Sequence, residues 1–210
     1  GAQAVYGNKN WSTSMVGVYP GYATVQNIEM EYGTFLDMSA VRNAATYAVI
    51  GPETAEELGM PKNPVGEIIR VRNTPLTVIG VTKAKGSSGM SSQDDMIIVP
   101  ITTLKKRITG SRFPNSVNMV ALKLYQDADN NIATEQITTL LRQRHKLKDG
   151  DADDFQITDM KQVMETMETV TGYLTLLLIA IAAVSLLVGS IGIMNMMLVS
   201  VAERTREIGI

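Results

Sequence analysis

Side chains that could carry out catalysis are sparse in this sequence. Its single histidine, His145, stands in a basic run from Arg142 to Lys148, and a histidine among cations on a predicted helix surface is typical of a solvated residue. Spacing alone still allows a serine–histidine–aspartate arrangement, but there is no Gly-x-Ser-x-Gly elbow and no phosphate-binding Gly-Lys-Ser/Thr loop. The absence of cysteine excludes disulfides, thiol catalysis and cysteine-ligated zinc. We therefore expect no catalytic residues and no cofactor in this stretch.

Two acidic runs are similar in composition to calcium-binding loops. They cover Asp127–Asn131 and Asp149–Asp154. An EF-hand loop needs glycine at its sixth position and glutamate at its twelfth. The first run has Ile132 and Thr138 there, and the second fails at both positions as well. We interpret both runs as polar loops next to helices and expect no metal site.

The charge balance argues against nucleic acid as a partner. Lys and Arg number 19 against 21 Asp and Glu, for a net charge of -2, whereas a nucleic-acid-binding domain carries a basic excess. A chain without thiols fits an extracytoplasmic domain, although many cytosolic proteins also lack cysteine. The apolar residues are unevenly spread, and their concentration toward the C-terminal end is informative.

A long uncharged stretch runs from Thr169 to Ala202. The hydrocarbon core of a bilayer needs about 20 apolar helical residues, and at about 1.5 Å per residue this stretch reaches roughly 50 Å as a helix. It therefore predicts one transmembrane helix that also projects above the membrane. The alternative is a very long core helix of a water-soluble protein.

The residues before this stretch predict that the helix starts well outside the lipid. Five apolar residues fall on one helical face: Met160, Val163, Met164, Met167 and Val170. Asp159 and Gln162 have the spacing of a capping box, with Asp in place of Ser or Thr. We expect one continuous helix from about Asp159. The alternative is a separate surface helix with a hinge at Gly172, because glycine weakens a helix interior by about 1 kcal/mol.

These patterns predict four parts in chain order. They are an extracytoplasmic domain (1–158), an amphipathic stalk helix (159–172), a transmembrane helix (173–201) and the start of a cytoplasmic segment (202–210). Arg204 and Arg206 follow the span directly, whereas only Lys161 lies close to its other end. Positive charge favours the cytoplasmic side, so we expect the C-terminal end to face the cytoplasm. Neither end resembles a natural terminus, and we expect a piece of a longer membrane protein.

Small and polar residues interrupt the span. They are Ser185, Gly189, Ser190, Gly192 and Asn195. Ser185 and Gly189 form a small-xxx-small pair, which lets two helices approach closely, and Asn195 should contact a neighbouring helix or the interface. This favours a helix packed in a bundle. The equal alternative is ordinary transmembrane composition, in which glycine is common.

Residues 1–158 predict an α+β fold with mixed α/β layers, not a doubly wound nucleotide-binding sheet. The expected strands, rich in Val, Ile, Thr and Tyr, are Met15–Tyr19, Tyr47–Gly51, Ile68–Arg72, Leu76–Thr82, Met96–Pro100, Val117–Tyr125 and Phe155–Thr158. The expected helices are Gly21–Met30, Glu53–Leu58, Ile101–Ile108 and Ile132–Leu147. We expect a hairpin turn at Asn73-Thr74 before Pro75. The polar segment Lys83–Asp95 should be a mobile, solvated loop, either a long hairpin tip or a contact for a partner.

The C-terminal segment resembles a known family of membrane proteins. After the apolar span, Gly192–Ile210 contains Glu-Arg-Thr-Arg-Glu-Ile-Gly, which resembles ABC-transporter permeases of the macrolide-exporter (MacB) type within the FtsX-like superfamily. Weaker similarities to the periplasmic core domain of that family occur at Ala48–Gly51, Pro64–Val71, Thr77–Val81 and Val99–Thr103.

The resemblance implies an architecture and a mode of action. Members have four transmembrane helices with the extracytoplasmic domain between the first two, and they work as dimers with ATPase domains that bind ATP and Mg²⁺. They pass ATP-driven motion through the stalk to the outside, which is called mechanotransmission. By resemblance, the chain is a non-catalytic permease part in the bacterial inner membrane, with residues 1 to about 172 extracytoplasmic. Its implied partners are an ABC ATPase domain or subunit, a second permease copy and an extracytoplasmic adaptor protein.

The resemblance also implies a role for the cytoplasmic end of the span. The residues that would contact the ATPase domain are Glu203, Arg204, Thr205, Arg206, Glu207, Ile208 and Gly209. The alternative is that these charges only anchor the helix at the lipid headgroups.

Efflux of antibiotics, peptides or toxins is the function that the resemblance favours. Lipoprotein release or control of cell-wall hydrolases is the alternative within the same superfamily. A single-pass receptor or adhesin is the alternative from a different class, and two further apolar spans after Ile210 would exclude it.

Overall fold

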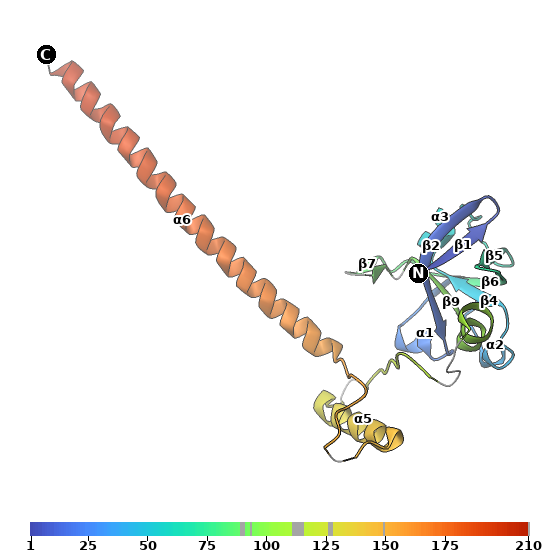
Figure 1. The fold of residues 1–210 in the computed structure, drawn as a ribbon. Coiled ribbons are helices and arrows are strands. Elements are labelled where there is room, and N and C mark those ends of the chain that lie inside the picture. Colours follow the sequence, from blue (N-terminus) through green and yellow to red (C-terminus); the bar gives the residue numbers. More distant parts are fainter. Residues whose placement is uncertain (89–90, 93, 111–115, 126–127, 149, 210) are drawn as a thin grey trace. The chain divides into compact units, whose positions relative to one another are not determined.

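The computed structural model describes residues 1–88, 91–92, 94–110, 116–125, 128–148 and 150–209. They form two compact units, Gly1–Lys123 and Leu124–Ile210, and each unit is described by itself. The strands of the described residues all lie in the first unit, and the two longest helices lie in the second (Figure 1).

The main sheet of the first unit closes on itself. Its strands are β1 (Ala2–Tyr6), β2 (Lys9–Val18), β3 (Met30–Gly33), β4 (Tyr47–Ile50), β5 (Ile68–Val71), β6 (Thr74–Thr82) and β9 (Met96–Pro100). They follow the order β3-β6-β4-β9-β2-β1-β5, and β5 also pairs with β6. The strands from β6 round to β5 therefore form a small barrel. Along the edge of β6, residues 74–77 pair with β5 and residues 80–82 pair with β3.

Successive residues along a strand point to opposite faces of the sheet, so neighbouring residues of the barrel strands pack into different clusters. On β4, Ala48 and Ile50 belong to the main core cluster, whereas Val49 between them packs into a second cluster. On β9, Ile97 belongs to the first cluster and Ile98 to the second. Both strands are buried on both faces, which is why their sequences are continuous apolar runs.

Short helices connect the strands. They are α1 (Tyr22–Val25), α2 (Met38–Arg42), α3 (Pro52–Glu57), α4 (Ile101–Thr103) and the π-helical turn η1 (Leu104–Thr109). Asp37 begins α2, and its carboxylate accepts a hydrogen bond from the Ala40 N–H at 2.8 Å. This bond, together with one from the Ser39 hydroxyl, lowers the pKa of Asp37. The Leu104 side chain packs against Gly17 of β2, where an added Cβ would lie 2.7 Å from Leu104 Cδ2.

The base of the polar segment Lys83–Asp95 is held by specific bonds. The Trp11 indole N–H donates to Asp95 Oδ1 at 2.9 Å, and the Thr54 hydroxyl donates to the same oxygen at 3.0 Å. Asp94 accepts from the backbone N–H groups of Lys85 and Gly86 at 2.9 and 2.8 Å. Within the segment, β7 (Ser87–Ser88) pairs with β8 (Ser91–Ser92), which confirms the hairpin. The predicted mobility of this loop concerns its tip, where 89, 90 and 93 lie outside the described residues, so it stays a prediction.

Most of the predicted core elements are confirmed, and the hairpin between β5 and β6 turns at Arg72 and Asn73, one residue earlier than expected. The strand predicted at Val117–Tyr125 is wrong. Its described residues carry no strand, and Met119 and Tyr125 are 80% and 92% exposed. The strand predicted at Phe155–Thr158 is wrong as well. Both segments have strand-like composition, but neither is paired with a neighbouring strand in the structure, and composition alone does not make a sheet.

The helix predicted at Gly21–Met30 is also wrong. Only α1 is helical, Asn27 takes a left-handed φ of 48°, and Met30 already belongs to β3. The strands β1 and β3 were not expected, since their sequences carry few β-branched residues; β3 also pairs with a partner about fifty positions later in the chain.

The second unit contains α5 (Asn130–His145) and α6 (Met160–Ile208). α5 begins at Asp129, whose carboxylate accepts from the backbone N–H of Asn131 at 2.8 Å. It ends at Lys146, which has left-handed backbone angles, as a helix C-terminus often requires. The predicted helix Ile132–Leu147 is therefore confirmed with a shift of two residues at each end.

We expect Gly51→Ala to destabilise the barrel by about 1–3 kcal/mol or more, as overpacking does. A Cβ at this position would lie 2.0 Å from the backbone oxygen of Asp94. Chemical denaturation followed by the fluorescence of Trp11, the single tryptophan, measures the change. Gly21→Ala is the control, because a Cβ there meets nothing within 4 Å. Equal stability of the two variants would contradict this packing argument.

Candidate coupling helix and its two ends

The start of α6 is fixed by one carboxylate with two partners. Asp159 Oδ1 accepts from the backbone N–H of Lys161 at 2.8 Å, which caps the helix. Its Oδ2 accepts from the side-chain amide of Asn130, the first residue of α5, at 2.9 Å. The Asn130 bond is the largest cause of a lowered pKa for Asp159, followed by the Lys161 N–H. The predicted cap is confirmed, and the bond to α5 was not foreseen.

From this cap α6 continues without a break to Ile208 (Figure 1). A separate surface helix with a hinge at Gly172 is therefore wrong, since Gly172 lies inside the helix. At about 1.5 Å per residue its 49 residues reach roughly 70 Å, against a hydrocarbon thickness of about 30 Å. Much of α6 must lie outside any bilayer that it crosses.

Several hydroxyl groups along α6 form hydrogen bonds within the helix. Thr169, Thr175 and Ser185 each donate to the carbonyl four residues earlier, at 2.8, 2.9 and 2.9 Å. Every residue from Met160 to Thr205 is exposed, and among the described residues this is the one helix long and apolar enough to cross a membrane. An apolar helix with internally bonded hydroxyls is compatible with lipid.

The small residues of the span only partly share a face. Ser185, Gly189 and Gly192 follow each other at spacings of four and three, so they lie along one side of the helix. A shallow groove along α6 is lined by Gly189, Gly192, Ile193, Met196, Met197 and Ser200. Ser190 lies about 100° round the helix from Gly189, and Asn195 does not line the groove. An added Cβ at Gly189 or Gly192 would meet nothing within 4 Å, so no described residue requires a glycine there.

The opposite end of α6 carries a second group of charged residues, beyond the uncharged stretch. Glu203, Arg204 and Thr205 are exposed in its last turns. The helix continues through Arg206, Glu207 and Ile208, whose side chains lie outside the described residues. Gly209 follows the helix, and its N–H donates to the Thr205 carbonyl at 3.2 Å. All the residues expected to contact an ATPase domain therefore lie in this last segment of the helix or directly after it.

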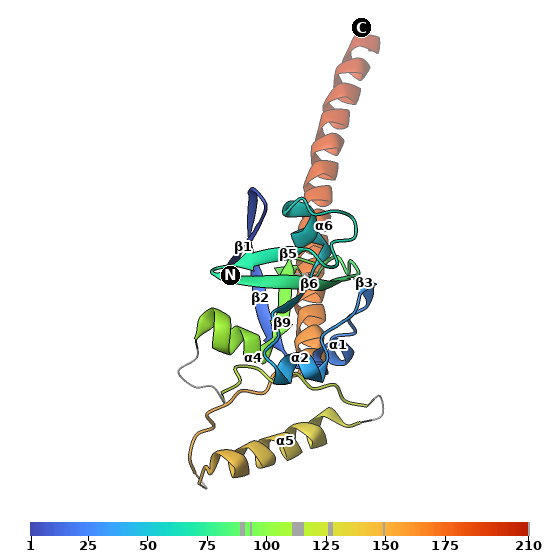
Figure 2. The same ribbon diagram turned by 90° about the vertical axis from the view of Figure 1, so that its right-hand side faces the viewer.

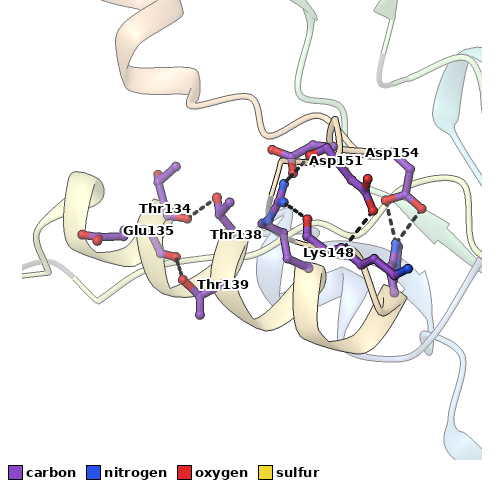
Figure 3. Close-up of polar contacts among 10 residues, drawn as sticks. Thr134, Glu135, Thr138, Thr139, Lys148, Asp151 and Asp154 are labelled. Carbon is purple, nitrogen blue, oxygen red and sulfur yellow. Dashed lines mark hydrogen bonds and ion pairs between the residues drawn. The ribbon is translucent and has the colours of Figure 1, made fainter.

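The C-terminal end of α5 forms a second polar cluster that includes the basic run (Figure 3). The Arg142 guanidinium donates to the carbonyls of Lys148 and Asp151 at 2.9 and 3.1 Å and pairs with Asp153. His145 Nδ1 lies 2.8 Å from Asp154 Oδ1. The second acidic run therefore lies against the end of α5, which confirms its interpretation as a polar loop next to a helix. In the part of the chain that the structure describes, no group of three His, Asp or Glu side chains could hold a metal ion.

A family model described as the MacB-like periplasmic core domain matches residues 1–140. The chain belongs to this family. The resemblance seen in the sequence is thereby confirmed, and the match covers the whole barrel of this MacB-like chain together with most of α5.

Curated MacB proteins match along nearly the whole chain. The macrolide export ATP-binding/permease protein MacB of Bdellovibrio bacteriovorus is 37% identical over 209 residues, which are 99% of this chain and 32% of that protein. The protein of the same name from Chlorobium luteolum is 41% identical over 208 residues, which are 99% of this chain and 31% of that protein. The MacB-like chain thus spans about a third of the length of these relatives.

Two solved structures share the fold. The periplasmic region of MacB from Actinobacillus actinomycetemcomitans matches with a TM-score of 0.62 at 22% identity, over 80% of this chain and 71% of that chain. The extracellular domain of the noncanonic ABC-type transporter YknZ from Gram-positive bacteria matches with a TM-score of 0.53 at 19% identity, over 70% of this chain and 72% of that chain. At these identities the likeness shows the fold alone, and it agrees with the expected α+β class.

We expect the carboxyl group of Asp159 to titrate below its ordinary pKa of 3.8. Because the pKa of Asp159 is lower in the folded protein, its carboxylate stabilises the capped junction fully at any pH above the ordinary pKa. This stabilisation is lost as the pH falls through the lower pKa of the folded protein. Carbon-13 chemical shifts of the Asp159 carboxyl group across an acid titration measure it. Asn130→Ala should raise the midpoint toward 3.8, and Asn131→Ala should leave it unchanged. An unaltered midpoint in Asn130→Ala would show that the amide bond is absent in solution.

Proposed function

We propose that this chain is the permease segment of an ABC exporter in which α6 carries ATP-driven movement from the cytoplasm to the extracytoplasmic domain. The observation that carries the proposal is the continuity of α6 from the Asp159 cap to the charged end at Glu203–Ile208. A single hydrogen-bonded rod transmits displacement along its length, whereas a hinge inside it would absorb the displacement.

The comparisons support the transporter class. The MacB relatives are named macrolide export ATP-binding/permease proteins, and this chain matches the part that contains their periplasmic core domain. By this proposal the protein lies in the bacterial inner membrane, with residues 1 to about 172 outside the cytoplasm. It is not itself catalytic, and it works with an ABC ATPase domain or subunit, a second permease copy and an extracytoplasmic adaptor protein. Antibiotics, peptides or toxins are the proposed substrates.

The charged end of α6 is the proposed site of coupling. Glu203 and Arg204, together with Arg206 and Glu207, place both signs of charge within two helical turns. An ATPase domain that changes conformation with nucleotide can shift α6 only if its two states contact this end differently. Charge pairs suit that role, because their energy depends strongly on distance and geometry.

The groove at Gly189 and Gly192 is the proposed packing face of the span. Side chains elsewhere on α6 would keep a second helix away, whereas two glycines within one turn permit close backbone approach. Ser185 lies on the same side and Ser190 does not, and Asn195 lies beside the groove. The partner would be a transmembrane helix of the same transporter.

We expect the double charge reversal Arg204→Glu plus Glu207→Lys, made in the complete transporter, to abolish macrolide efflux while ATP hydrolysis and membrane insertion continue. The physical reason is that both contacts with the ATPase domain become repulsive. Efflux from loaded cells and ATPase rate in membranes are measured side by side. The control is Glu57→Lys plus Lys106→Glu, at two exposed positions of the first unit. This double variant also leaves the net charge unchanged. Normal efflux by the Arg204/Glu207 variant would refute the coupling role and leave headgroup anchoring.

We expect Gly189→Leu to weaken association of α6 with its partner helix by about 1–3 kcal/mol, as overpacking of a close contact does. Energy transfer between labelled helices in lipid vesicles measures the association. Gly172→Leu is the matched control, because this glycine also meets nothing within 4 Å but lies away from the groove. If the two variants associate equally well, the glycines reflect ordinary transmembrane composition.

A further inference from the structure

The starts of α5 and α6 meet although 29 positions separate Asn130 from Asp159. The strap, defined here as residues 146–148 and 150–159, leads from the C-terminal end of α5 back to the start of α6 (Figure 2). Asp159 uses one oxygen to cap α6 and the other to accept the Asn130 amide. The same carboxylate therefore belongs to the first turn of α6 and to the contact with α5.

The strap is also held at the far end of α5. Arg142 donates to two strap carbonyls, of Lys148 and Asp151, and pairs with Asp153. His145 contacts Asp154, and its ring stands edge-on to Phe155 with centroids 6.0 Å apart. In Figure 3, Asp151 and Asp154 are seen facing the last turns of α5. Both ends of the strap are thus tied to the same helix.

These ties decide whether movement of α6 can reach α5. The described part of the strap has no helix or strand, and a free flexible linker of this length would span roughly 20 Å and take up displacement as slack. Every residue of α6 from Met160 to Thr205 is exposed, so α5 and α6 share no buried apolar interface among these residues. The polar contacts at the two ends of the strap therefore carry the proposed connection.

We propose that the Asn130–Asp159 hydrogen bond is the contact that makes α5 follow α6, with Arg142 and His145 holding the strap taut. Asn130, Arg142, His145 and Asp159 are positioning residues in this scheme. The inference rests on the proposed function, because it names where the movement delivered by α6 is received. α5 then presents its exposed polar face, including Glu135 and Thr139, as a moving extracytoplasmic surface.

The test uses the complete transporter with spin labels on Thr139→Cys in α5 and Glu168→Cys in α6, both exposed positions. Electron-spin distance measurements are made without nucleotide and with ATP. We expect one narrow distance that is the same in both states. Asn130→Asp should broaden the distance and make it depend on nucleotide, because a second carboxylate replaces the donor opposite Asp159. Aspartate is favourable in the first turn of a helix, so α5 itself should remain folded.

Two further variants separate this contact from a general effect on folding. Asn131→Asp places the same charge one residue away and should behave like the parent. Asn130→Asp combined with Asp159→Asn restores an amide–carboxylate pair with the roles exchanged, and asparagine is also a good helix cap, so the narrow distance should return. Export per ATP hydrolysed should fall at least about fivefold in Asn130→Asp, the lower end of typical coupling effects, and recover in the exchanged pair.

Two results would overturn the inference: a narrow, nucleotide-independent distance in Asn130→Asp, or a distance in the parent that already changes with ATP.

Failure of the proposed function would give a different result. A single label at Glu168→Cys reports on the movement of α6 relative to its copy in the dimer. If that distance ignores ATP, α6 carries no movement, whatever the state of the Asn130 contact. If it responds while α5 does not follow, only the further inference is wrong.

Discussion

A helix that crosses lipid has to satisfy its backbone hydrogen bonds within itself, because no water is available to replace them. This constraint explains most of the second unit. It favours the unbroken course of α6 through Gly172 and the bonding of Thr175 and Ser185 back to the helix. The same continuity gives a helix much longer than a bilayer is thick, so that a charged end and a capped end are both free to contact water-soluble partners.

The two units differ in where their apolar residues lie. The barrel buries an apolar core and pairs its backbone groups round a closed sheet, so its stability lies in packing. α6 exposes its apolar surface, and its contacts with the rest of its unit are concentrated at the Asp159 junction and the strap. The junction itself is an amide–carboxylate hydrogen bond, whereas the strap is held to α5 by partly exposed ion pairs, each of which contributes only about 0–1 kcal/mol.

The sequence predicts best those elements whose signal is local. The apolar runs of β4 and β9, the cap at Asp159 and the whole of α6 followed from composition and spacing. The failures come from strand pairing or backbone conformation that the local pattern of residues does not specify. Val117–Tyr125 has the composition of a strand but is not paired in the structure, and the left-handed Asn27 ended a helix that the pattern would have continued. The bond from Asn130 to Asp159 could not be foreseen, because an Asn at a helix start and an Asp cap each have a sufficient local explanation. A local hint was present at the other end of α5, where basic residues directly precede an acidic loop.

The closed ring of strands sets the order in which the first unit can fold. β2 pairs on one side with β1, its immediate neighbour in the chain, but on the other side with β9, in parallel and some eighty positions later. The β1–β2 and β5–β6 hairpins are local and can form early in folding, whereas the ring stays open until β9 pairs with β2. Such long-range pairing is slow, so the half-made barrel exposes strand edges for the whole of that interval. Once β9 has paired with β2, the closed ring leaves neither strand with a free edge on that side, which protects the domain from edge-to-edge pairing with another chain.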